Sequence, residues 1–307
     1  MNKYNTGFNL RSGYGFSRVL SMHSGLLFVV CLLLFASHSV SATETDDDNS
    51  AHFVFAPITD QYPQYVADPR TPHTGLLFLG VPESEIDGTS GTRINIHLRA
   101  RFGILRFGDT NDMQAWQLDF EGGFFGHFDY HHNLDGIGWD GIYELYLSKH
   151  LSSKWIVRVG DAHDSAHVGD EFMEKKGRER IGYTREEIIV GTAWIPDKIW
   201  RAYSEAGWSG NLKGDEDHLR FQFGIEYYSP TKFQLTNQDW YVAFDANLFE
   251  ERHWSPATTL QLGLIQPSVK PGERFRFVVE LYNGRSVLGE FSFEDETYLG
   301  LGFYYDY

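Results

Sequence analysis

Long stretches of this sequence alternate strictly between apolar and polar residues, and this period-two pattern limits the possible folds more than any other feature. Between residues 93 and 102, apolar residues take the even positions, while arginine, asparagine and histidine take the odd ones. The same split recurs at 116–129, 218–227 and 274–281. Successive side chains of a β-strand point to opposite faces, so each stretch predicts a strand with one apolar and one polar face.

Twelve such strands are predicted after Pro72. Many of them reach the roughly 9 to 11 residues that a tilted strand needs to cross a membrane, whereas strands of soluble sheets usually have about five or six. The predicted strands are 74–80, 92–107, 115–129, 139–149, 154–165, 186–195, 199–209, 218–228, 239–250, 257–266, 273–283 and 296–306.

These strands predict an all-β fold, an antiparallel up-and-down transmembrane β-barrel of about 12 strands. Closure is required because an open sheet edge in hydrocarbon would leave backbone groups without partners. A soluble sandwich or barrel is the alternative, but it would normally turn its charges outward, whereas here arginine and glutamate share the face that would line an interior. With about 12 strands the lumen is expected to be narrow and filled by those side chains.

The first 42 residues are typical of a secretory signal peptide, with basic residues, an apolar run at 25–36 and small residues before Ala42. The run is about 12 residues long, too short for the roughly 20 of a membrane-spanning helix. Export would place the protein in the outer membrane of a Gram-negative bacterium. Residues 43–71 form an acidic, proline-containing leader, and 72–307 form the predicted barrel domain.

The charge balance excludes one class of partner. The sequence has 42 acidic and 26 basic residues. Three basic residues fall within the predicted signal peptide, so 23 basic against 42 acidic residues give the remainder a net charge of −19. Such a surface repels phosphate backbones, and no nucleic-acid partner is expected. The single cysteine, Cys31, also lies in the signal peptide, so disulfides are not expected after cleavage.

Histidines, a hydroxyl group and several carboxylates gather at 161–172. His163 and Ser165 are two residues apart and share one face of a strand, as a general base and a nucleophile would. They have the same parity as the apolar residues of 155–159, so an unbroken strand turns them toward lipid. A third group would have to orient the imidazole. The candidates for this acid are Asp170, Glu171 and Glu174.

Two other interpretations of this stretch stay open. A loop could begin at Gly169, with Asp164 and Ser165 bonded to the backbone there. Alternatively, a loop could gather metal ligands for calcium or zinc, although two histidines four apart on a strand would be about 13 Å from each other. The ligands of that site would be His163, His167, Asp170 and Glu171.

Glu186 and Glu187 are adjacent carboxylates further along the chain. They differ in parity, so they point to opposite faces of a strand. They therefore cannot form a shared-proton pair on one strand.

Four phrases make the chain resemble family 1207 of the bacterial domains of unknown function, from about residue 53 to the end. Where that family usually has two adjacent serines after the histidine, this chain has Ser165 and then Ala166. The phrases are Ala67-Asp-Pro-Arg-Thr-Pro72, Trp116-Gln-Leu-Asp-Phe-Glu-Gly-Gly123, His163-Asp-Ser-Ala-His-Val-Gly-Asp-Glu171, and Tyr282-Asn-Gly-Arg-Ser286 followed by Gly300-Leu-Gly-Phe-Tyr-Tyr-Asp306.

The His-x-Ser pair is similar to a pair on a barrel strand of outer-membrane phospholipase A and lipid A 3-O-deacylase. In those enzymes an asparagine or glutamate follows a little over ten residues later. The final strand, which ends on Tyr307, also resembles the terminal strand that the barrel-assembly machinery binds.

The leading hypothesis is therefore an outer-membrane β-barrel with a narrow, polar-filled lumen. The first alternative is an acyl hydrolase that acts on phospholipid or lipopolysaccharide through His163 and Ser165. The second is a barrel that transports or binds a small solute. The expected partners are outer-membrane lipids and the barrel-assembly machinery, with a monomer favoured over a dimer. No cofactor is predicted, with calcium as an option only if the site is a hydrolase.

Overall fold

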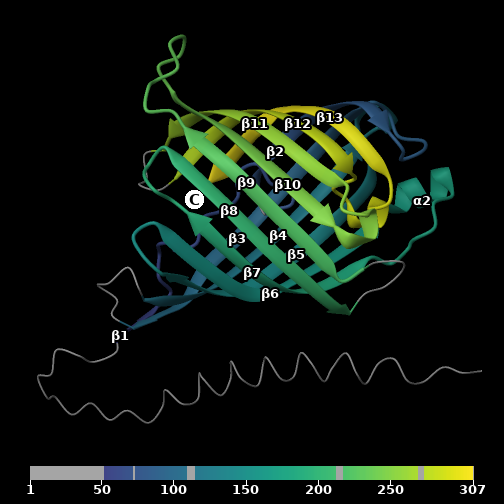
Figure 1. The fold of residues 1–307 in the computed structure, drawn as a ribbon. Coiled ribbons are helices and arrows are strands. Elements are labelled where there is room, and N and C mark those ends of the chain that lie inside the picture. Colours follow the sequence, from purple (N-terminus) through teal and green to yellow (C-terminus); the bar gives the residue numbers. More distant parts are fainter. Residues whose placement is uncertain (1–51, 72, 109–114, 212–216, 269–272, 307) are drawn as a thin grey trace, which may run out of the picture. The chain divides into compact units, whose positions relative to one another are not determined.

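The strands of this protein form one antiparallel sheet that closes on itself. The computed structural model describes residues 52–71, 73–108, 115–211, 217–268 and 273–306, and the predicted signal peptide lies outside them. From β2 to β13 each strand pairs with its sequence neighbours, β13 pairs with β2, and β3 pairs with both β2 and β4. The twelve predicted strands are confirmed as β2 to β13, and Figure 1 shows them side by side.

The barrel strands are 10 to 17 residues long. Their bounds are β2 (Thr74–Ser84), β3 (Thr92–Gly108), β4 (Trp116–Asp129), β5 (Asp135–His150), β6 (Trp155–Val168), β7 (Thr184–Trp194), β8 (Trp200–Asn211), β9 (Leu219–Tyr228), β10 (Asp239–Phe249), β11 (Pro256–Pro267), β12 (Arg274–Arg285) and β13 (Asp295–Asp306).

A short thirteenth strand, β1 (His52–Phe55), precedes the barrel within the predicted leader. It pairs with residues 105–108 of β3. That edge of β3 is available because β2 pairs only with residues 92–97. The sequence pattern is too short here to indicate a strand.

The helices among the described residues are all short. They are α2 (Asp170–Lys176), η2 (Tyr130–His132), η3 (Glu250–Arg252) and η4 (Gly289–Phe291). None of the helices in the described ranges has the length and apolarity to cross a membrane. Gly169 is followed by α2 rather than by the loop that the sequence suggested, and Figure 1 shows α2 beyond the strand ends.

The exterior of the barrel is apolar. On β9, Phe221, Phe223 and Ile225 are exposed, while Gln222 and Glu226, which have the opposite parity, are buried. The same inversion holds on β12 and β13, where exposed apolar side chains alternate with buried partners. The predicted assignment of faces is therefore confirmed. Many of the side chains buried on the inside are charged or polar, whereas a soluble domain keeps most such side chains on its surface.

Two girdles of tryptophan mark the ends of this apolar exterior. We call the end where β2 begins and β13 ends the terminal end, and the opposite end the loop end. Aromatic girdles at both interfaces are typical of membrane barrels. Near the terminal end lie Trp155, Trp194, Trp200 and Trp240, and near the loop end lie Trp139, Trp208 and Trp254.

Inside the barrel, arginine and glutamate alternate in a continuous network that we call the luminal charge chain. Arg158 donates to Glu205 at 2.9 Å and to Glu144 at 3.1 Å, and Arg220 joins Glu205 to Glu187 at 2.7 and 2.8 Å. Every charge has an opposite neighbour, which buried ions require. The order is Glu144, Arg158, Glu205, Arg220, Glu187, Arg185, Glu251 and Arg285.

Residues 56–71 of the leader pass through the lumen and complete this network. Tyr62 and Tyr65 share a hydrogen bond of 2.8 Å, and the guanidinium of Arg158 lies 4.8 Å from the Tyr62 ring. Burial raises the pKa of Tyr62 to about 12, so its hydroxyl stays protonated. The backbone directly after Tyr65 is also bound, since Val66 N–H donates to Glu226 at 3.2 Å. The predicted leader and barrel thus share one interior.

The connection between β12 and β13 folds inward at the loop end. Residues 286–292 are all buried. Leu288 and Phe291 pack with Ile137, Val168 and Phe172 in an apolar cluster. The leader and this connection therefore both contribute buried side chains to the interior.

Substituting Arg158 tests the luminal charge chain. We expect Arg158→Met to lower the free energy of unfolding by about 3–5 kcal/mol, because Glu144 and Glu205 would keep buried charges without their cation. Urea unfolding in detergent, followed by tryptophan fluorescence, measures this. The exposed Lys198→Met is the matched control, and equal losses for both variants would contradict the role of the chain.

Candidate functional site

Strand β6 carries the candidate His-x-Ser pair on the exterior of the barrel. Trp155 and Val159 of the same parity are exposed, and Ile156 and Arg158 between them are buried. β6 continues without a bulge through its pairings with β5 and β7. His163 and Ser165 therefore lie on the outward face, as predicted.

A carboxylate on the neighbouring strand binds the candidate base. His163 lies opposite Glu186 of β7, and its Nδ1 is 2.6 Å from Glu186 Oε1. On the other side, the Tyr143 ring of β5 stacks on the imidazole, with centroids 4.6 Å apart and planes 17° apart. Both contacts restrict the ring, and the bond at Nδ1 leaves Nε2 as the nitrogen that can accept a proton.

Ser165 occupies the next outward position toward the loop end. It lies between Gly141 of β5 and Thr184 of β7 in the strand register. Residues two apart on a strand are about 6.6 Å from each other along its axis. Catalytic hydrogen bonds are often long before a substrate binds, so the pair is a candidate on the basis of shared face and spacing.

The three predicted acids lie elsewhere. Asp170, Glu171 and Glu174 are exposed on α2, which begins after the end of β6. Glu186 takes the position that these residues were expected to fill. The predicted strands 154–165 and 186–195 already contained both partners. The sequence did not give the register between these two strands, and a shift of two residues decides whether Glu186 faces His163 or Ser165.

The structure does not support the metal alternative. His167 stacks on Trp139 at 4.0 Å, and its Nδ1 accepts a hydrogen bond from Arg180 at 2.8 Å. Asp170 and Glu171 are separated from both histidines by the end of β6. In the described ranges, no three His, Cys, Asp or Glu side chains are grouped to hold a metal ion.

The predicted parity of the two glutamates is confirmed. Glu186 is bound to His163 on the exterior, whereas Glu187 binds Arg185 and Arg220 inside. Ala166, which stands where the family usually has its second serine, is buried against Gly289. That position faces the interior and is on the opposite side of β6 from Ser165.

Arg70 of the leader holds β6 from the inside. Its guanidinium bonds to Asp140 at 3.1 Å, and it also pairs with Asp164 and donates to the Val287 carbonyl. Burial alone would lower the pKa of Arg70, but Asp164 and Asp140 raise it above its ordinary value. Asp164 lies between His163 and Ser165, so this ion pair fixes the strand at the candidate site. Asp164 therefore does not bond to the backbone of a loop.

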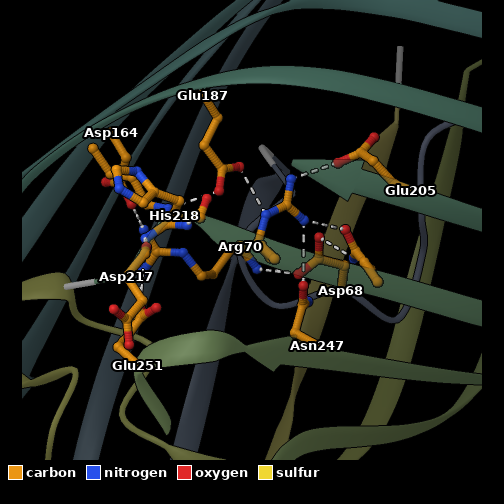
Figure 2. Close-up of polar contacts among 12 residues, drawn as sticks. Asp68, Arg70, Asp164, Glu187, Glu205, Asp217, His218, Asn247 and Glu251 are labelled. Atoms are coloured by element: carbon orange, nitrogen blue, oxygen red, sulfur yellow. Dashed lines mark hydrogen bonds and ion pairs between the residues drawn. The ribbon is translucent and has the colours of Figure 1, made fainter. Parts of the chain in front are cut away.

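The lumen beside this contact holds a cavity of about 80 Å³, room for a few water molecules. Its lining includes residues of the leader and of the luminal charge chain, several of which Figure 2 shows. Tyr183 also contributes, and burial raises its pKa to about 12. The cavity is thus surrounded by groups that are already paired with one another.

Three solved structures share this fold at low sequence identity. Outer membrane phospholipase A from Escherichia coli has a TM-score of 0.54 and 12% identity over 76% of this chain and 92% of that chain. An active-site mutant of it has a TM-score of 0.54 and 13% identity over 80% and 92%. The calcium-bound dimer of the Salmonella typhi outer membrane phospholipase has a TM-score of 0.55 and 12% identity over 77% and 93%.

A comparison with curated protein sequences found no match. A family model described as "Protein of unknown function (DUF1207)" matches residues 51–307. That match covers the leader segment inside the lumen as well as all twelve barrel strands. The predicted resemblance is confirmed, and the chain belongs to the DUF1207 family of outer-membrane-type β-barrels.

Proposed function

We propose that this protein resides in the outer membrane and hydrolyses acyl esters of lipids at the exterior of its barrel. The proposed roles are Ser165 as nucleophile, His163 as general base and Glu186 as the acid that orients the imidazole. The substrates would be phospholipid or lipopolysaccharide, which lie against the apolar exterior. The barrel-assembly machinery is the proposed partner during insertion, and the proposed state is a monomer, with a dimer as the alternative.

The observation that carries this proposal is the 2.6 Å contact between His163 Nδ1 and Glu186 Oε1. An ionisable pair on the outward face of a membrane barrel is costly without a use, since most of that face is apolar. The contact also supplies the third member that a histidine and a serine need to act as a nucleophilic unit. Two successive outward positions of β6 carry His163 and Ser165, and Glu186 lies on β7 opposite His163.

The proposed reaction balances with these groups alone. Ser165 Oγ attacks the ester carbonyl while His163 Nε2 takes the hydroxyl proton, and Glu186 stabilises the imidazolium. The tetrahedral intermediate then expels the lipid alcohol, which receives the proton from His163. Water, activated by the same imidazole, hydrolyses the acyl-serine, so that one ester and one water yield a fatty acid and a lysolipid.

Calcium is present in the Salmonella phospholipase dimer. Around Ser165 of this chain, the described residues do not form a group of three or more carboxylate or imidazole ligands. This donor set does not fit a calcium site within one copy, and no step of the proposed reaction is assigned to the metal.

Small-solute transport has weaker support. The leader and the β12–β13 connection lie in the lumen, and the cavity beside Arg70 holds about 80 Å³. A solute would pass only if these segments moved and the buried ion pairs separated. No contact in the described ranges favours such a movement.

Release of fatty acid tests the proposed catalysis. In vesicles of outer-membrane lipid, the full-length protein is expected to release fatty acid, with and without calcium. Ser165→Ala is expected to lower the rate about 10³-fold or more, because it removes the nucleophile. Absence of release by the unmodified protein from phospholipid and from lipopolysaccharide would refute the hydrolase.

Substitution of Glu186 tests its assignment as the acid that orients the imidazole. Glu186→Gln is expected to lower the rate about 10- to 100-fold, because the amide cannot stabilise the imidazolium as a carboxylate does. Glu171→Gln on α2 is the matched control and should change it less than twofold. A larger effect at Glu171 than at Glu186 would show that the orienting acid is wrongly assigned. Heat-modifiable gel mobility verifies that each variant folds.

Residence in the membrane is tested by fractionation. We expect the protein in the outer-membrane fraction, extractable only by detergent, because its exterior exposes rows of large apolar side chains. Folded protein should migrate faster than boiled protein on a gel. Recovery of folded protein from the soluble periplasm would contradict the proposed location.

A further inference from the structure

A tryptophan, a histidine and an arginine form a stack on the exterior, one outward position beyond Ser165 toward the loop end. Trp139 of β5 lies opposite His167 of β6, and their rings are 4.0 Å apart with planes inclined by 25°. Arg180, in the connection between β6 and β7, donates from Nη2 to His167 Nδ1 at 2.8 Å. The acylation chemistry proposed above uses none of these three residues.

The stack is close to the proposed nucleophile. Ser165 and His167 share the outward face of β6 and are about 6.6 Å apart along it. The guanidinium of Arg180 is in turn one hydrogen bond from His167. A positive charge therefore follows the serine in the direction of the loop end, where Trp139 belongs to the tryptophan girdle of the interface.

Arg180 differs from two other cations of its connection, Lys175 and Arg178. Lys175 pairs with Asp135 and Arg178 with Glu294, each at 2.5 Å. The carboxylate nearest to Arg180 belongs to Glu290, and the distance from Nε is 3.9 Å.

The oxygens of Glu290 are already in use. They accept the backbone N–H groups of residues 181, 182 and 183 at 2.8 to 3.2 Å. The Arg180 side chain is 46% exposed and has five N–H donors, so several of them can bind an anion.

We propose that Arg180, positioned by His167 and Trp139, binds the phosphate of the lipid whose ester lies at Ser165. This subsite rests on the proposed function, and it assigns the substrate to phosphate-bearing acylated lipids rather than neutral acylglycerols. Guanidinium groups bind phosphate through two parallel hydrogen bonds, which a lysine cannot reproduce. The phosphate could belong to a glycerophospholipid or to a phosphorylated saccharolipid, since both combine it with nearby acyl esters.

Binding to a protein that cannot turn over its substrate tests the subsite separately from catalysis. The full chain carrying Ser165→Ala is mixed in detergent with phosphatidic acid or with diacylglycerol of the same acyl chains, and native mass spectrometry measures the bound lipid. We expect at least tenfold tighter binding of phosphatidic acid. Adding Arg180→Gln should abolish this preference, Arg180→Lys should retain part of it, and Lys175→Gln should retain all of it.

Further arms identify the source of the phosphate. Lipid A with its phosphates is compared with the dephosphorylated form, and inorganic phosphate is added as a competitor. A preference for phosphatidic acid alone indicates a glycerophospholipid, and a preference for phosphorylated lipid A alone indicates a saccharolipid. Displacement of either lipid by an equal concentration of inorganic phosphate would overturn the proposal, since the site would then recognise the free ion.

The remaining outcomes separate this inference from the hydrolase. Equal loss of binding in the Lys175→Gln and Arg180→Gln variants would reduce the effect to general charge attraction and would refute the subsite. Selective binding that depends on Arg180, in a protein without fatty-acid release, would refute the hydrolase and support the subsite. Hydrolysis of phosphatidic acid and diacylglycerol at equal rates, with no dependence on Arg180, would refute the subsite and support the hydrolase.

Discussion

Pairing of charges inside the barrel is the interaction on which this structure depends. The exterior consists mainly of apolar side chains, so most of the charged residues that alternate with them point inward. An unpaired charge there would cost several kcal/mol, and Arg158, Arg185 and Arg220 each contact two carboxylates. Arg158, for example, forms ion pairs with Glu144 and Glu205. Its guanidinium also lies 4.8 Å from the Tyr62 ring. A lumen filled in this way leaves little space for a solute.

The leader segment is part of the same network. Its tyrosines and backbone bind arginines and glutamates of strands that are far apart in sequence, so it stabilises the barrel from within. Three of the four phrases that resemble the family meet at or beside Arg70. The first phrase contains this arginine, the third contains its partner Asp164, and the fourth includes Ser286, which precedes Val287, whose carbonyl accepts a hydrogen bond from Arg70. These phrases are distant in the sequence and adjacent in the fold.

The ion pair between Arg70 and Asp164 links the interior of the barrel to the candidate site on its exterior. Asp164 points into the lumen while His163 and Ser165 point out, so the ion pair with Arg70 holds the segment that displays the candidate nucleophile and base. On the outside, the position of the imidazole depends on Tyr143 and Glu186 from the two flanking strands. The proposed phosphate subsite continues the same outward row, from Ser165 to His167 and then to Arg180. The proposed chemistry therefore occupies the exterior face, and the luminal charges support it.

The sequence by itself determined the twelve barrel strands, their two faces and the outward orientation of His163 and Ser165, because alternation is a local property that each strand carries alone. It did not indicate β1 or α2, whose four and seven residues are too few to show a period. It also selected acids on α2 as partners of His163, whereas the tertiary structure brought Glu186 there. Which residue of β7 faces His163 depends on the register between two strands, and a shift of two residues would have placed the carboxylate beside Ser165 instead. The path of the leader through the lumen was likewise decided only by the closed barrel, since its partners come from strands throughout the chain.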